Sequence, residues 1–497
     1  MSPADTPRAR NLALGLLAMA QFVVVLDAAI VNVALPSIGR DLDFAQGDLS
    51  WVVNAYTLMF GGFLLLGGRL ADLLGRRRLF VWGMWLFALA SLAGGLAQSD
   101  IWLVVARGVQ GLGAALISPA ALSIVTTTFA EGAERNKALG VWGAVAGSGG
   151  AAGVLLGGLL TEGFGWEWVL FVNTPIGIAS ALLAPRLLNE SHDASSPSFD
   201  FAGAFSVTAG LALLVYTLVD ANDAGWGSTQ TLVLGAVSVA LLAAFVVIEA
   251  RRRYPIMPFS IFRLRTLRGA NVIGLLIGMS LFSMFFFISL YMQQVLGYGP
   301  LKAGLAYLPL AVLIIISASV ASQLVTRVGF KPTLIAGMLL VAAGLIWFGQ
   351  VSAPGGTYVG DVLFPSLLAA VGLGLAFVSV TIAAVTGTRP DEAGLASGLI
   401  NTSQQVGGAL GLAVLATIAT GRTDDLLASG ERNPAVALTQ GFQDAFLAGA
   451  GLALLATLLA ATLISSRDSR EHAEAAQRGE AMPGPAAAEE TGSQVTA

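Results

Sequence analysis

Two lone charges of opposite sign lie inside otherwise apolar stretches of this chain. Asp27 sits in the middle of the run 23–36, and Arg107 lies inside a later apolar stretch. A carboxylate near the centre of a bilayer costs roughly 2.5–3.5 kcal/mol on insertion scales, so such groups usually have a function. Burial favours the neutral form of a carboxyl group, and a nearby cation favours its charged form. The two residues therefore predict a site that handles a proton or a cation. Purely structural roles, in helix packing for Asp27 and in capping backbone carbonyls for Arg107, are the alternatives.

Composition places the chain in a membrane. It is 56% hydrophobic and 11% charged over 497 residues, with a mean hydropathy of +0.78. Soluble domains carry about 25% charged residues. Apolar stretches of about 20 residues, each long enough to cross a bilayer as a helix, recur along almost the whole chain.

Several kinds of chemistry are disfavoured by what the sequence lacks. There is no cysteine, and the two histidines, His192 and His472, fall in polar connecting segments where we expect them to be solvated. We therefore expect no metal site. No Gly-x-x-x-x-Gly-Lys-Ser/Thr run is present, so we expect a proton gradient as the energy source and no cofactor.

We predict fourteen membrane-spanning helices. With the N-terminus in the cytoplasm, 21 of the 26 Lys and Arg fall in cytoplasmic segments, four fall in outer segments, and Arg107 lies within a span. Because Lys and Arg concentrate on the cytoplasmic side of membrane proteins, this bias predicts an even number of spans and cytoplasmic chain ends. The spans cover residues 11–36, 48–70, 79–98, 101–129, 137–160, 168–188, 201–219, 230–249, 269–292, 302–325, 332–350, 361–386, 394–420 and 441–464.

A weak internal repeat divides the spans into two related halves. Residues 68–78 match 322–332 at an offset of 254, and residues 111–115 match 372–376 at an offset of 261. Chance matching of Gly and Leu is the alternative. Parallel halves place a binding site at their midplane interface and alternate its access by rocking. The expected parts are a six-helix bundle at 11–188, two inserted helices with a basic cytoplasmic linker at 189–268, a second six-helix bundle at 269–464 and a disordered cytoplasmic tail at 465–497. One exposed helical turn or two near residues 467–478 is the alternative for the tail.

The segment 68–78 resembles the signature loop of the major facilitator superfamily, between its second and third helices. In that family the aspartate of the loop locks the two halves together on the cytoplasmic side, at the positive end of a helix in the other half. The resemblance implies that Asp72 reaches the helix starting near Ala393; a simple surface ion pair is the alternative. The latch residues would be Gly68, Asp72, Gly75, Arg76 and Arg77.

Three further segments resemble motifs of that superfamily, and the Asp27 segment among them resembles its fourteen-span drug/proton antiporters in particular. Residues 107–115 are similar to the fourth-helix motif associated with proton coupling, and the Asp27 segment is similar to the first-helix motif. The resemblance implies that Asp27 and Arg107 are the proton-coupling residues, and whether they touch stays open. The glycines of the fifth span resemble the antiporter motif, although Val154 stands where that motif has proline. The helix-packing glycines would be Gly143, Gly147, Gly153 and Gly157.

Polar residues of both halves are candidates for the substrate cavity. We expect apolar and aromatic walls with few charges, which suit bulky amphipathic compounds. Taken one at a time, most of these polar residues could equally be helix-packing groups. The candidates are Asn32, Gln110, Tyr291, Gln294, Asn401, Gln404 and Gln405.

Together these features predict an all-α integral membrane protein of the major facilitator fold that exports an amphipathic small molecule in exchange for protons. Asp27 is the expected proton site and Arg107 its electrostatic partner, and proton and substrate would favour opposite access states. We expect a monomer in the cell membrane, with protons, a small-molecule substrate and lipid as partners and no nucleic acid. The alternatives are uptake, export of one dedicated metabolite, and a membrane sensor or scaffold without transport.

Overall fold

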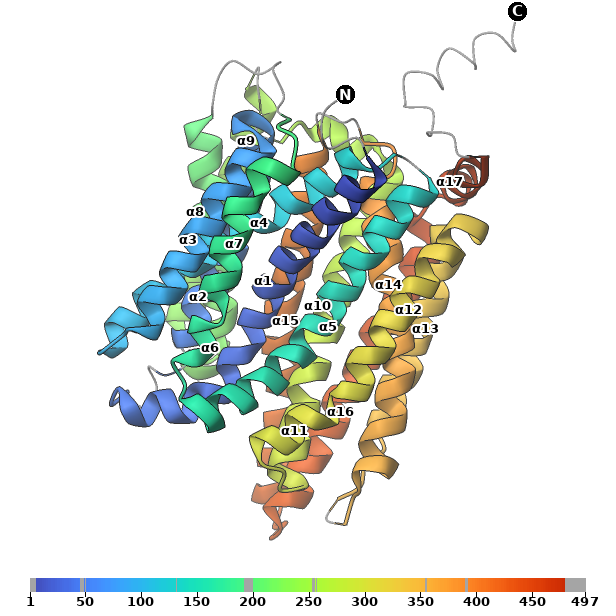
Figure 1. The fold of residues 1–497 in the computed structure, drawn as a ribbon. Helices are drawn as coiled ribbons and strands as arrows, with labels where there is room; N and C mark the ends of the chain where they lie inside the picture. Colours follow the sequence, from blue (N-terminus) through green and yellow to red (C-terminus); the bar gives the residue numbers. More distant parts are fainter. Residues whose placement is uncertain are drawn as a thin grey trace, which may run out of the picture.

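The regular elements of the described chain are all helices, and they run side by side along one direction (Figure 1). The computed structural model describes residues 6–44, 49, 51–130, 132–191, 200–252, 255, 257–353, 355–388 and 392–478. The first helix begins, and the last helix lies, at the same end of the bundle (Figure 1). We call this end the terminal face.

The first half contains the helices expected from the first six spans. Its third helix begins at Gly75, whose φ of +104° is a backbone conformation that favours glycine. The fourth begins after Ser99, whose hydroxyl accepts a hydrogen bond from Trp102 N, an N-cap typical of serine. The helices are α1 (Pro7–Asp41), α2 (Trp51–Leu74), α3 (Arg76–Gly95), α4 (Asp100–Thr128), α5 (Ala133–Phe164), α6 (Trp168–Phe171) and α7 (Asn173–Leu187).

Two inserted helices, α8 (Phe201–Ala224) and α9 (Thr229–Arg251), precede the second half. Besides α9, α8 packs against one helix of each half, namely α2 and α15, so the inserted pair lies over the boundary between the halves. The remaining elements are the 3-10 turn η3 (Phe259–Arg263), α10 (Arg265–Leu290), the π-helical turn η4 (Tyr291–Val295), α11 (Pro300–Ala306), α12 (Leu308–Val328), α13 (Phe330–Phe348), the π-helical turn η5 (Tyr358–Leu363), α14 (Phe364–Val385), α15 (Ala393–Ala428), α16 (Pro434–Leu463) and α17 (Ser466–Arg478).

Helices occur at all fourteen positions where a membrane span was predicted, but they do not all have the same length and composition. Twelve spans in the described residues are long and apolar enough to cross a membrane. A thirteenth is α5, if its parts Ala133–Gly150 and Ala152–Phe164, which meet at a 43° bend, form one span. The apolar stretch of α8, Ala202–Leu218, is shorter.

One helix contact recurs in both halves and supports the internal repeat. A Cβ added at Gly153 of α5 would lie 2.7 Å from Leu26 O of α1. In the second half, a Cβ at Gly407 of α15 would overlap Leu275 O of α10. The two glycines are 254 residues apart, which is one of the two offsets found in the sequence. Each half thus uses a glycine at the equivalent place to bring two helix backbones together.

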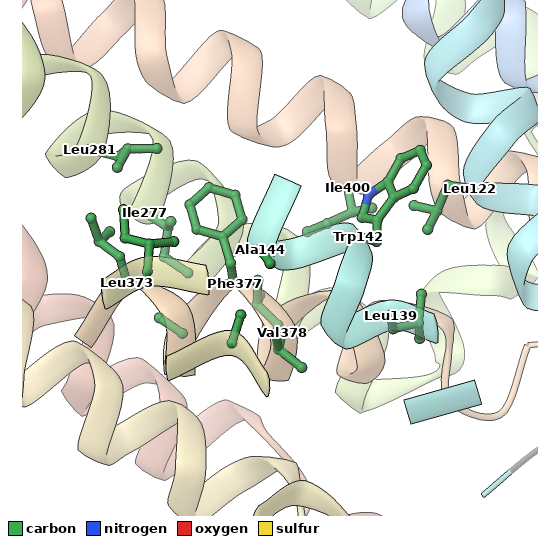
Figure 2. Packing of buried hydrophobic residues seen from close by; sticks show 14 of the residues in the cluster. Leu122, Leu139, Trp142, Ala144, Ile277, Leu281, Leu373, Phe377, Val378 and Ile400 are labelled. Carbon is green, nitrogen blue, oxygen red and sulfur yellow. The ribbon is translucent and has the colours of Figure 1, made fainter. Parts of the chain in front are cut away.

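Apolar side chains from both halves form one continuous core. Figure 2 shows Trp142 of α5 near Leu122 of α4 and Ile400 of α15, with Phe377 and Val378 of α14 nearby. Trp142 lies about 14 Å along α5 from the start of that helix, at 1.5 Å per residue. The halves are therefore packed tightly together in the part of the bundle nearer the terminal face.

The tail does not begin as a disordered segment, and this prediction is corrected by the structure. Residues 466–478 form α17, which packs on α12 and α13 and buries Ser469, His472 and three alanines. Small side chains at these positions allow a polar helix to pack closely. His472 is consequently buried, not solvated, and its Nε2 lies 3.0 Å from Asn136 Oδ1. His192 and residues 479–497 lie outside the described residues.

Candidate proton-coupling site and interdomain latch

Asp27 and Arg107 form a completely buried ion pair. Asp27 lies on α1 and Arg107 on α4, and neither side chain has exposed surface. Arg107 Nη1 donates to Asp27 Oδ2 at 2.5 Å, and Arg107 Nε donates to Val52 O of α2 at 3.0 Å. The arginine thus connects three helices of the first half around one carboxylate.

Two side-chain amides bind the other oxygen of this carboxylate. Gln110 Nε2 donates to Asp27 Oδ1 at 2.8 Å, and Asn173 Nδ2 donates to the same oxygen at 2.6 Å. Gln110 lies three residues after Arg107 on α4, and its Oε1 accepts from Arg107 Nη1 at 2.7 Å. Gln110 Nε2 also lies 2.5 Å from Ser91 Oγ of α3. The roles of Asn173 and Ser91 were not predicted, although Asn173 begins the run Asn-Thr-Pro-Ile-Gly, a polar start to an apolar helix.

The aromatic ring of Tyr56, on α2, packs against the guanidinium group of Arg107. The Arg107 Cζ lies 4.5 Å from the centre of the Tyr56 ring, in the range of a cation–π interaction. The Tyr56 hydroxyl donates to Val24 O of α1 at 2.9 Å, one turn before Asp27. Sequence reasoning missed Tyr56, because an uncharged residue in an apolar helix carries no visible signal of this role.

The network stabilises the charged form of the Asp27 carboxylate, and its hydrogen bonds would change if that carboxylate took up a proton. Three donors surround Asp27, and hydrogen bonds to an ionised group are stronger than those between neutral groups. Protonation would remove the charge that orders Arg107, Gln110 and Asn173. All these partners belong to the first half, and Asp27 is closed off in this conformation. Exchange of a proton with a central cavity therefore requires the contacts around Asp27 to open.

Two buried groups of the same network keep unused hydrogen-bonding capacity. Within the described residues, Arg107 Nη2 and Asn173 Oδ1 have no hydrogen-bond partner and are shielded from solvent. One is a donor and the other an acceptor. A small polar ligand or a proton carrier that reached this site would find both available.

Asp72 connects the two halves at the terminal face. Its carboxylate is fully buried, and its Oδ2 accepts from Leu395 N in the first turn of α15 at 3.1 Å. Its Oδ1 accepts from Arg76 Nη2 at 2.8 Å and from Arg76 Nε at 3.1 Å. The positive end of a helix dipole favours an anion at this position. The geometry is that of the latch implied by the family resemblance.

Of the other predicted latch residues, Arg76 binds Asp72, whereas Gly68, Gly75 and Arg77 have different roles. A Cβ added at Gly398 of α15 would lie 3.5 Å from Gly68 Cα, so Gly68 lies at the contact of α2 with α15. Arg77 interacts with Glu190: its backbone N donates to Glu190 Oε1 at 3.1 Å, and its Nε lies 3.6 Å from Glu190 Oε2. A Cβ at Gly75 would lie 2.7 Å from Glu190 Oε1, so a larger residue there would displace the Glu190 carboxylate and would also adopt a strained φ of +104°.

The glycines of α5 permit close helix contacts. A Cβ at Gly143 would lie 2.7 Å from Val378 Cγ2 of α14, and one at Gly157 would lie 2.7 Å from Ile30 O of α1. Together with Gly153, they pack α5 against the first half on one side and the second half on the other. The packing of Gly147 lies outside what the structure describes.

The structure does not bring the seven cavity candidates together. Gln110 belongs to the Asp27 network, whereas Tyr291 is buried at the end of α10 and donates to Ser352 O at 2.9 Å. Asn401 donates to Ser397 O of its own helix at 2.9 Å. Tyr291 is 26 residues from the start of α10 and Asn401 eight residues from the start of α15.

The remaining cavity candidates differ in exposure. Asn32 is exposed and donates to Ala28 O at 3.3 Å. Gln294 is exposed, and Gln405 is half-buried. Gln404 Nε2 is buried and has no hydrogen-bond partner among the described residues. Of the seven, Gln404 is the strongest remaining candidate for a ligand contact in the second half.

A membrane bundle of two alike halves, with a latch at one face and a buried ion pair in one half, defines the class of alternating-access transporters. The chain belongs to the major facilitator superfamily, whose family model, described as "Major Facilitator Superfamily", matches residues 17–412.

Similar proteins are found among antibiotic resistance and export proteins. The puromycin resistance protein pur8 of Streptomyces alboniger is 39% identical over 454 residues, covering 90% of each chain. The cephamycin export protein CmcT of Amycolatopsis lactamdurans is 42% identical over 439 residues, covering 88% of each chain. The solved structure of the human organic anion transporter MFSD10 (TETRAN) covers 92% of this chain and 100% of its own, with a TM-score of 0.66 and 16% identity. That structural likeness shows the shared fold.

Proposed function

We propose that this protein exports amphipathic small molecules across the cell membrane in exchange for protons. The main support for the proposal is the fully buried ion pair of Asp27 and Arg107. An intramembrane carboxylate bound by an arginine and two amides from different helices can change the relative positions of those helices when it binds a proton. The two relatives named for puromycin resistance and for cephamycin export support the export of antibiotic-like compounds. The terminal face is cytoplasmic in this proposal, the protein acts as a monomer, and no cofactor takes part.

In the proposed cycle, Asp27 carries the proton. Proton uptake neutralises the carboxylate, so Arg107, Gln110 and Asn173 lose the anion that orders them. The helices α1, α4 and α7 can then change their relative positions, and the latch at Asp72 can release α15. Substrate favours the opposite access state, so proton and substrate compete through coupled sites.

The specific alternative is export of a single dedicated metabolite. It is favoured by the relative named for the export of one antibiotic class, cephamycin. A panel containing puromycin, a cephamycin and cationic dyes separates the two possibilities. Transport of several unrelated compounds supports broad export, and transport of one compound alone supports the dedicated form.

Everted membrane vesicles from a host without its own drug pumps test the direction and the coupling. Respiration acidifies the vesicle lumen, and we expect vesicles containing this protein to accumulate ethidium until an ionophore collapses the proton gradient. Vesicles from the same host without the protein are the control. Accumulation by right-side-out vesicles instead would reject export, and accumulation that survives the ionophore would reject proton coupling.

A further inference from the structure

The two halves meet along two seams at the terminal face, and the Asp72 latch occupies only one of them. That seam joins α2 to α15, and the other joins α5 to α12. The internal repeat relates the two seams: Thr326 stands 254 residues after Asp72, at the equivalent position of the second half. Asp72 accepts from the first turn of α15, and Thr326 correspondingly faces the first turn of α5.

Asn136 completes the contact at the second seam. It lies in the first turn of α5 and is fully buried. Its Nδ2 donates to Thr326 Oγ1 at 3.0 Å, and its Oδ1 lies 3.0 Å from His472 Nε2. Because an amide oxygen only accepts, His472 Nε2 is the donor. One amide thus joins α5 of the first half, α12 of the second half and the tail helix α17.

The tail helix is attached firmly to the second half. Gln477 Nε2 donates to Thr326 O at 3.2 Å and to Arg327 O at 2.9 Å. Ser469 Oγ accepts from Lys331 N at 3.0 Å, and Asp468 accepts from Thr266 Oγ1 of α10 at 2.5 Å. These contacts place α17 on α10, α12 and α13 independently of the first half.

Against the first half, α17 makes a smaller contact that opening of the seam would break. Besides the His472–Asn136 hydrogen bond, it places Ala476 against Gly132, where a Cβ added to the glycine would lie 3.1 Å from Ala476 Cα. Both contacts lie at the start of α5. A helix that is fixed to the second half and also contacts the start of α5 in the first half connects the two halves across the seam.

We propose that α17 is a second latch, which holds the seam between α5 and α12 closed at the terminal face through the shared amide of Asn136. The proposal rests on the proposed transport cycle, in which this face must open. The contact joins the seam that the Asp72 latch does not occupy, through the hydrogen bonds of Asn136 with Thr326 and His472. His472 and Asn136 are positioning residues for the closed conformation, and they do not touch substrate.

The absence of cysteine in the chain makes a direct distance measurement possible. Spin labels at Lys137→Cys on α5 and Arg327→Cys on α12, both exposed positions, report the width of this seam by electron–electron double resonance. We expect the labelled full chain to populate mainly the short distance. His472→Ala should raise the ratio of open to closed seam about threefold to tenfold, the equivalent of one hydrogen bond.

Three variants show whether the effect comes from the proposed contact. His472→Gln keeps a side-chain donor and should restore most of the short distance. Glu474→Gln changes an exposed residue on the opposite face of α17 and should leave the distances unchanged. Ala476→Leu, which wedges a larger side chain against Gly132, should open the seam without altering His472.

The proposal is overturned if both His472→Ala and Ala476→Leu give the distances of the full chain. In that outcome α17 is only a packed end of the second half. Transport of puromycin, a cephamycin and cationic dyes by the labelled full chain is measured on the same preparation. Absence of transport of every compound would reject the proposed function and would leave the distance result, and hence the test of α17 as a second latch, intact.

Discussion

At the scale of single residues, the central feature is the cage of donors around Asp27. One guanidinium and two amides bind the two carboxylate oxygens, and the Tyr56 ring orders the guanidinium. The arrangement explains how a charge can remain inside an apolar bundle, because each oxygen has a donor. It also makes the partners sensitive to loss of that charge.

Truncation of Arg107 tests this dependence. Arg107→Ala leaves the Asp27 carboxylate buried without its cation, and removing one partner of a buried ion pair costs about 3–5 kcal/mol. We therefore expect a large loss in the free energy of unfolding, measured by denaturation in mixed detergent with tryptophan fluorescence. The double variant Asp27→Asn with Arg107→Met is neutral and should recover much of the loss. Equal losses in the single and double variants would contradict an electrostatic origin.

At the scale of helices, glycines decide which backbones approach closely. In the run 107–115 of α4, two glycines three residues apart have different neighbours. A Cβ at Gly108 would meet only Met59 Cγ, at 3.7 Å, whereas a Cβ at Gly111 would overlap Tyr56 O of α2. The contact at Gly111 brings Tyr56 close enough to reach Arg107. The motif therefore serves helix packing and the ion pair at once.

This difference predicts opposite outcomes for two conservative substitutions. Gly108→Ala should be neutral or stabilising, because alanine is the better helix former by about 1 kcal/mol and the site has room. Gly111→Ala should destabilise by about 1–3 kcal/mol, because the added methyl group forces α4 away from α2. Melting temperatures of the two variants in detergent provide the comparison. Similar values for both would show that α2 and α4 are not in tight contact at Gly111.

Features marked by local patterns could be predicted from the sequence, whereas features that depend on helix rotation could not. The Asp72 loop and the helix order carry strong local signals. The contact of Asp27 with Arg107 joins residues 80 apart in the chain and depends on how α1 and α4 are turned about their axes. Tyr291 was predicted as an aromatic wall of the cavity, and nothing in the sequence indicated that its hydroxyl donates to Ser352 O. His472 was misjudged because a polar tail gave no sign of the small-residue face that packs α17.

At the scale of the whole molecule, the described chain is closed at the terminal face by both seams. The Asp72 contact with α15 joins the first seam, which α8 also covers. Asn136 and α17 join the second seam. Between them lies the shared apolar core around Trp142 and Phe377 (Figure 2). Opening this face requires all these contacts to separate. The binding step that opens it, of proton or of substrate, must therefore favour the open conformation by enough free energy to break them.

The most direct test of the account measures proton movement by the purified protein with and without its buried carboxyl group. Proteoliposomes containing a trapped pH-sensitive dye would be given ethidium on one side, with the intact chain and Asp27→Asn compared at equal protein content. We predict that ethidium movement by the intact chain drives proton movement in the opposite direction. We expect Asp27→Asn, which leaves Arg107 buried without its anion, to be less stable but folded, to retain ethidium exchange and to move no protons. Proton movement by Asp27→Asn at the rate of the intact chain would contradict the central claim.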